Sequence, residues 1–149
     1  MKHISLPTKL YNLAYRLTGN TQLAERIALN AVENVANQGI SVDNEELFQY
    51  AVKEIVDLTV NQYPYHIPGY SEEQDTSCQL QAILNTLPAS ERFTVVLRDI
   101  CGFSSSQVAG FMNIKIEIIQ QLLATGRCEV CRLVNDKKMT ERFEKIASK

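Results

Sequence analysis

One short stretch constrains the fold more than any other part of the sequence: Ser104-Ser105-Ser106-Gln107-Val108-Ala109-Gly110-Phe111-Met112-Asn113-Ile114. It opens with a serine and, three residues later, a glutamine, which is the capping-box pattern of a helix start. Apolar residues then recur at helical spacing, and Asn113 can adopt the left-handed backbone of a tight turn at little cost. A longer periodic stretch follows from about Lys115 to Val134. Two helices around a tight turn predict a helix-turn-helix in the C-terminal half, about Leu80 to Val134.

Helices are also predicted on both sides of this motif. In the N-terminal half, three stretches with apolar residues at helical spacing are separated by glycines, as expected where helices end. They run from Leu6 to Leu17, from Asn20 or Thr21 to Gly39, and from Asp43 to Leu58. The later helices stop before Pro88 and at Gly102, and a short amphipathic tail helix is expected from Asn135.

The composition agrees with an all-α fold. The 149 residues are 45% hydrophobic and 21% charged, with only six glycines and four prolines, which favours helices over a turn-rich β fold. No apolar run approaches the roughly 20 residues of a membrane span, so no membrane insertion is expected. Residues 1–5 lack the apolar core of a secretory signal. A cytoplasmic location is therefore expected, with the four cysteines reduced.

The helices are expected to form two small domains joined by a linker. Residues 1–62 are predicted to form a three-helix domain, and residues 79–149 a domain that contains the helix-turn-helix and the tail helix. Between them, residues 63–78 have two prolines, no helical period and an acidic, polar end. Such a stretch is typical of a linker.

Charge is distributed unevenly along the chain. The formal net charge is −2, which alone argues weakly against a nucleic-acid partner. Residues 104–149, however, carry eight Lys or Arg against five Asp or Glu. The C-terminal domain is therefore the part expected to face a phosphate backbone, although a solvated surface can look similar.

The C-terminal motif resembles the promoter −35 binding region of the extracytoplasmic-function group of bacterial sigma factors. The resemblance is carried by Leu87-Pro88-Ala89-Ser90-Glu91-Arg92, Val95-Val96-Leu97-Arg98-Asp99, Gly102-Phe103-Ser104, Gln107-Val108-Ala109 and Asn113-Ile114. A second resemblance, to the −10 and polymerase-binding region of the same family, is carried by Leu10-Tyr11, Ala14-Tyr15-Arg16-Leu17-Thr18-Gly19-Asn20 and Ala24-Glu25. The two regions come in the family's order.

The resemblance implies a sigma-like transcription initiation factor, in which a region 2-like bundle and a region 4-like helix-turn-helix bridge core RNA polymerase and promoter DNA. It also implies an anti-sigma factor as a possible partner. The implied DNA-binding residues lie in the second helix of the motif: Lys115, Gln120, Gln121, Thr125 and Arg127. The implied polymerase-binding residues are Glu25, Arg26 and Leu29.

Several substitutions leave a second interpretation open. Ile118 and Leu122, one turn apart, form an apolar strip where the family is expected to contact phosphates, and leucine cannot make that contact. Arg26 stands where the family places an acidic residue. The alternative is a degenerate sigma relative that acts by protein–protein contact with polymerase, a sigma factor or a regulator, without promoter recognition.

The sequence offers no chemistry for catalysis, a cofactor or a metal. No nucleophile–base order, phosphate-cradling glycine loop or paired-carboxylate pocket can be argued from it. Cys128 and Cys131 share a helix face, but zinc sites usually need four ligands and no further ligand has a recognised spacing. These cysteines are expected to be free thiols, and the protein is not expected to be an enzyme.

Overall fold

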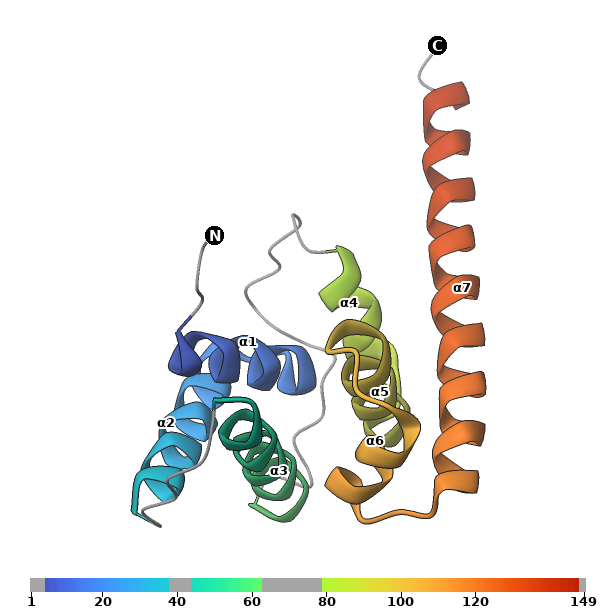
Figure 1. The fold of residues 1–149 in the computed structure, drawn as a ribbon. Helices are drawn as coiled ribbons and strands as arrows, with labels where there is room; N and C mark the ends of the chain where they lie inside the picture. The colour runs from blue at the N-terminus through green and yellow to red at the C-terminus, as the bar shows by residue number, and fades with distance from the viewer. Residues whose placement is uncertain (1–4, 38–43, 63–78, 148–149) are drawn as a thin grey trace.

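A computed structural model describes residues 5–37, 44–62 and 79–147 of the chain. These residues form helices and no strand, which confirms the all-α prediction (Figure 1). The elements are α1 (Leu6–Thr18), α2 (Thr21–Asn37), α3 (Asn44–Gln62), α4 (Gln79–Thr86), α5 (Ala89–Val95), the π-helical turn η1 (Val96–Ile100), α6 (Ser105–Met112) and α7 (Ile116–Ala147).

The first two helices are separated where the sequence signals predict it. Gly19 closes α1 with a left-handed backbone (φ 69°), and a Cβ there would overlap the Asn85 side chain, so glycine meets two requirements at once. Asn20 then caps α2, because its Oδ1 accepts from the Leu23 N–H at 2.9 Å. Gly39 and Asp43, the expected ends of the next two helices, lie outside the described residues.

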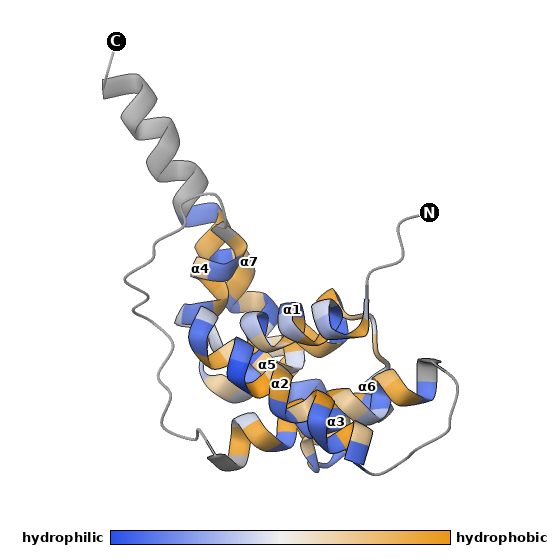
Figure 2. Ribbon diagram, turned by 90° about the vertical axis from the view of Figure 1, so that its left-hand side faces the viewer, coloured by the Kyte–Doolittle hydropathy of each residue, from blue (hydrophilic) through white to orange (hydrophobic). Residues whose placement is uncertain are grey.

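The helices form two groups that lie side by side, α1–α3 and α4–α7 (Figure 1). Polar and apolar residues alternate along the helices (Figure 2), and each group buries its apolar faces. Leu10, Leu17, Ile27 and Ile55 are fully buried in the first group. The second group buries Leu84, Leu87, Leu97 and Ile119, and the buried residues of both groups belong to one continuous core.

Two features differ from the expectation. The helix that begins at Ala89 ends in a π-helical turn, where the Cys101 N–H donates to the Val96 carbonyl five residues earlier. In addition, α7 is one helix from Ile116 to Ala147, so the separate tail helix expected from Asn135 is wrong.

The stretch 63–78, expected to be the linker, lies outside the described residues, and the domain boundaries stay a prediction. Within the described ranges, no helix combines the length and hydrophobicity that a membrane span requires.

Candidate functional site

The turn between α6 and α7 is built by the residues that the sequence singled out. Ser104 and Gln107 form the predicted capping box, with Ser104 Oγ accepting from the Gln107 N–H at 3.1 Å and Gln107 Oε1 accepting from the Ser104 N–H at 2.9 Å. Asn113 has the expected left-handed backbone, with φ 55°. The Ile114 N–H then bonds back to the Ala109 carbonyl at 3.1 Å, which fixes the angle at which the chain enters α7.

The packing of α7 determines which of its side chains face outward. Ile119 and Leu123 are buried against the neighbouring helices, and Gly126 lies directly on α5. A Cβ on Gly126 would approach Val95 Cγ2 to 2.8 Å, so only glycine allows the two helices to come this close. The first turns of α7 therefore present their opposite side to solvent.

All five residues expected to bind DNA lie on the exposed surface, but they do not form a single row. Lys115 precedes α7. Gln121 and Thr125 lie one turn apart, and the Thr125 hydroxyl donates to the Gln121 carbonyl at 3.1 Å. Gln120 and Arg127, about two turns apart, form a second row.

Arg127 has a partner within the protein that sequence reasoning missed. Its guanidinium bonds both carboxylate oxygens of Asp99 in η1, with Nε–Oδ2 2.9 Å and Nη2–Oδ1 2.5 Å. This hydrogen bond, together with the guanidinium charge, holds the pKa of Asp99 below its usual range. The positive charge of Arg127 is thus neutralised at the surface where a phosphate contact was expected. Asp99 belongs to the family-like motif, but nothing in its spacing from Arg127 indicates the pair.

Aliphatic side chains are exposed beside the polar ones. Ile116 is 38% exposed and Ile118 is 44% exposed, whereas Leu122 is half-buried and packs against the core. The predicted strip of Ile118 and Leu122 is therefore open to solvent mainly at Ile118. Glu117 is also exposed, in the first turn of α7, where a carboxylate favours the positive end of the helix dipole.

The residues expected to bind polymerase gather on the outer side of α2. Glu25, Arg26 and Leu29 are all exposed and lie within one helical turn of one another. Leu29 is 58% exposed, the largest value among the large hydrophobic side chains of the described residues. The opposite side of α2, including Ile27 and Ala31, is buried against α1 and α3.

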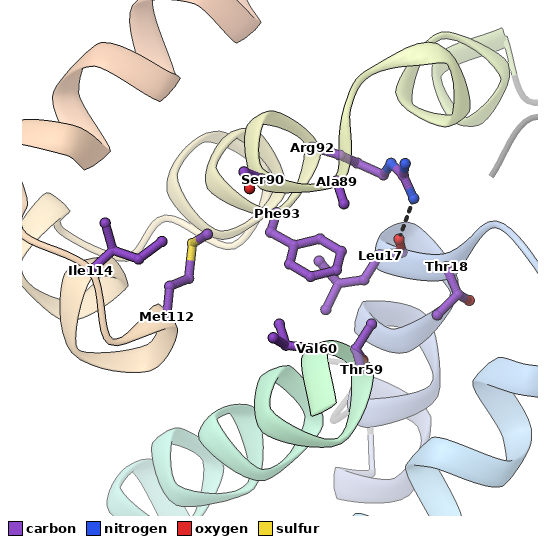
Figure 3. A pocket seen from close by; sticks show the side chains of 10 residues that line it. All are labelled: Leu17, Thr18, Thr59, Val60, Ala89, Ser90, Arg92, Phe93, Met112 and Ile114. Atoms are coloured by element: carbon purple, nitrogen blue, oxygen red, sulfur yellow. Dashed lines mark hydrogen bonds between the residues drawn. The ribbon is translucent and has the colours of Figure 1, made fainter. Parts of the chain in front are cut away.

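Polar contacts join the two groups of helices. The buried Arg92 of α5 donates to the Leu17 carbonyl at 2.8 Å, across the seam between the α1–α3 and α4–α7 groups (Figure 3). It also donates to the Leu87 carbonyl at 2.9 Å. Gln81 of α4 donates to the Arg16 carbonyl at 3.3 Å. Sequence reasoning placed Arg92 in the family-like motif but missed this contact, because its partner is a backbone atom 75 positions away.

Aromatic packing and a small cavity complete the seam. Phe48 of α3 stacks on Phe103, with ring centroids 6.0 Å apart. Between the groups lies a cavity of about 220 Å³, lined by Leu17, Thr18, Thr59 and Val60 from the first group and by Ala89, Ser90, Arg92, Phe93, Met112 and Ile114 from the second (Figure 3). The α1–α3 and α4–α7 groups are thus held in direct contact.

A comparison of this arrangement with solved structures finds a clear likeness. The structure is similar to that of the sigma factor RpoE from Bartonella quintana, which was solved in complex with the anti-sigma factor NepR. The TM-score is 0.62 and the sequence identity 19%, over 87% of this chain and 92% of that chain. The chain has the fold of a sigma factor. No family model matches the sequence, and no curated protein matches it.

Proposed function

We propose that this protein is a sigma-like transcription initiation factor that binds core RNA polymerase and promoter DNA. The observation that carries the proposal is the extent of the sigma-factor fold, which includes both groups of helices and nearly the whole of the related chain. In this proposal, α2 docks on polymerase through Glu25, Arg26 and Leu29. The recognition helix is the first part of α7, where Gln120, Gln121 and Thr125 are exposed, together with the exposed Lys115 just before it.

The contact between the two groups of helices limits which promoter elements they can reach at the same time. The −10 and −35 elements of a promoter are separated by about 25 base pairs, or roughly 85 Å of duplex. Two groups that share one core cannot reach both elements at once. Promoter binding by both groups therefore requires the seam at Arg92 and Phe48 to open, and core polymerase is the partner proposed to hold the groups apart.

A second candidate function is supported by the charge of α7. Arg127 is neutralised by Asp99, and Ile116 and Ile118 are exposed, so the surface offers few phosphate contacts. These features favour a sigma relative that binds other proteins. An anti-sigma factor is a proposed partner in either case, since the related sigma factor was solved with one.

Two binding measurements separate the candidates. The full chain is mixed with core RNA polymerase and run on a sizing column, and its retention on duplex DNA is measured from low to physiological salt. An initiation factor is expected to elute with polymerase and to hold DNA in a salt-sensitive way, because phosphate contacts release counterions. Polymerase binding with no DNA retention at low salt, either free or in the complex, would support the protein-binding candidate instead.

A further inference from the structure

We propose that the exposed side of α7 reads A·T base pairs in the major groove and disfavours guanine. The inference rests on the proposed function, since it takes α7 as the helix that meets DNA. It concerns the chemistry of the side chains on the first turns of that helix, whose outward direction is fixed by the buried Ile119 and Leu123.

The first step is the lack of a partner for guanine. In the major groove guanine presents two acceptors, N7 and O6, and the commonest specific contact to them is a bidentate Arg or Lys. Residues 116–125 contain no Arg or Lys, and Lys115, which precedes α7, is assigned in this proposal to a phosphate. Arg127, the next cation along α7, is held by both carboxylate oxygens of Asp99.

The second step is a partner for adenine. Adenine presents one acceptor, N7, and one donor, N6–H₂, and a glutamine amide matches both at once. Gln121 is exposed, with Glu117 one turn before it and Thr125 one turn after it. The Thr125 hydroxyl donates its proton within the helix, to the Gln121 and Leu122 carbonyls. The Gln121 amide is therefore the group on this row that can both donate to a base and accept from it.

The third step is a partner for thymine. Thymine differs from the other bases by its C5-methyl group, which aliphatic side chains contact. Ile118 is 44% exposed and lies three residues before Gln121, so the two Cβ atoms are neighbours on the helix surface, about 5–6 Å apart. An adenine-reading amide and a methyl-reading aliphatic group can thus address neighbouring base pairs. The exposed Ile118 side chain cannot contact a phosphate, but in this proposal it contributes to base recognition.

The test measures binding of the full chain, at low salt, to matched duplexes that differ in composition. Fluorescence anisotropy is recorded for a duplex made only of A·T pairs, for one made only of G·C pairs, and for the A·T duplex with deoxyuridine in place of thymidine, which removes only the C5-methyl groups. We expect about tenfold tighter binding to the A·T duplex than to the G·C duplex, and weaker binding to the deoxyuridine duplex.

Three variants assign the effect to residues. Gln121→Ala should abolish most of the A·T preference, and Ile118→Ala should remove the difference between thymidine and deoxyuridine. Asn12→Ala, at an exposed position of α1, should change neither. Equal binding to A·T and G·C duplexes would overturn the inference and leave the proposed function standing. No salt-sensitive binding to any duplex would overturn both the inference and the DNA-binding part of the proposed function.

Discussion

Arg92 bonds the Leu17 carbonyl at 2.8 Å and the Leu87 carbonyl at 2.9 Å, and so joins the C-terminal ends of α1 and α4 through one buried guanidinium. Burial lowers the pKa of Arg92 to about 10, which still leaves the side chain charged at neutral pH. Carbonyl groups at helix C-termini carry partial negative charge, and two of them offset a buried cation that bonds no carboxylate within the described part of the chain. Together with the Gln81–Arg16 hydrogen bond and the Phe48–Phe103 stack, this contact joins the two groups of helices.

Replacing Arg92 should loosen the seam. In Arg92→Met, the side chain keeps its apolar stem but leaves two buried carbonyls without their donor, and we expect the free energy of unfolding to fall by about 2–4 kcal/mol. Arg92→Lys keeps the charge but replaces the two donor nitrogens of the guanidinium with one, so an intermediate loss is expected. Urea denaturation followed by circular dichroism measures both variants. An unfolding midpoint for Arg92→Met equal to that of the wild type would contradict the role of Arg92 in holding the two groups of helices together.

The close approach of α7 to α5 at Gly126 gives a second prediction. A Cβ in Gly126→Ala would lie 2.8 Å from Val95 Cγ2, and a β-branched side chain has little freedom to move away. We expect a net destabilisation of about 1–2 kcal/mol, because overpacking exceeds the gain in helix propensity. Gly110→Ala in α6 is the matched control, since nothing lies within 4 Å of its Cβ position and a gain of about 0.5–1 kcal/mol is expected. The midpoint temperatures of thermal unfolding of the two variants should therefore shift in opposite directions. A shift in the same direction would argue against the close approach of α7 to α5 at Gly126.

Gly19, Gly126 and Arg92 show which features of the fold the sequence predicts and which it does not. Helix ends followed from local signals: Gly19, the Ser104–Gln107 capping box and the left-handed Asn113 each act within a few residues. The π turn, the Gly126 crossing and the Arg92–Leu17 bond depend on partners far away in sequence, so no local pattern announces them. The residues predicted to bind DNA are all exposed, and their role stays a prediction. The Asp99–Arg127 pair could not be predicted, because it depends on how α7 lies against η1.

Releasing Arg127 should strengthen DNA binding. In Asp99→Asn, the guanidinium loses its carboxylate and the surface loses one negative charge, so affinity for duplex DNA at low salt should rise about three- to tenfold. Asp57→Asn, which removes the same charge from α3, is the control and should have a smaller effect. Unchanged affinity in Asp99→Asn would mean that Arg127 makes no phosphate contact.

The same pair predicts a small dependence of stability on pH. Because the pKa of Asp99 is lowered in the folded protein, the pair stabilises the fold above the ordinary carboxyl pKa of about 4 and is lost as the pH falls through the lowered pKa. Both side chains are partly exposed, Arg127 at 50% and Asp99 at 33%, so solvent screening should keep this contribution to stability small. Urea denaturation at pH 7 and pH 3 should show a smaller loss of stability on acidification for Asp99→Asn than for the wild type.

The exposed leucine of α2 tests the proposed polymerase surface. Leu29→Asp places a charge where an apolar contact is proposed, and we expect unchanged thermal stability with at least tenfold weaker binding to core polymerase. Leu80→Asp is the matched control, because Leu80 in α4 is also an exposed leucine, at 41%. Equal loss of polymerase binding in both variants, or in neither, would count against α2 as the docking surface.

The most direct test of the sigma-like function is run-off transcription with purified core RNA polymerase, this protein and a library of genomic fragments. We expect discrete transcripts that depend on the protein, start downstream of a shared A·T-rich element and weaken with Leu29→Asp. A preparation of core polymerase shown to be active with another sigma factor, yet yielding no protein-dependent transcript from any fragment, would contradict the sigma-like function.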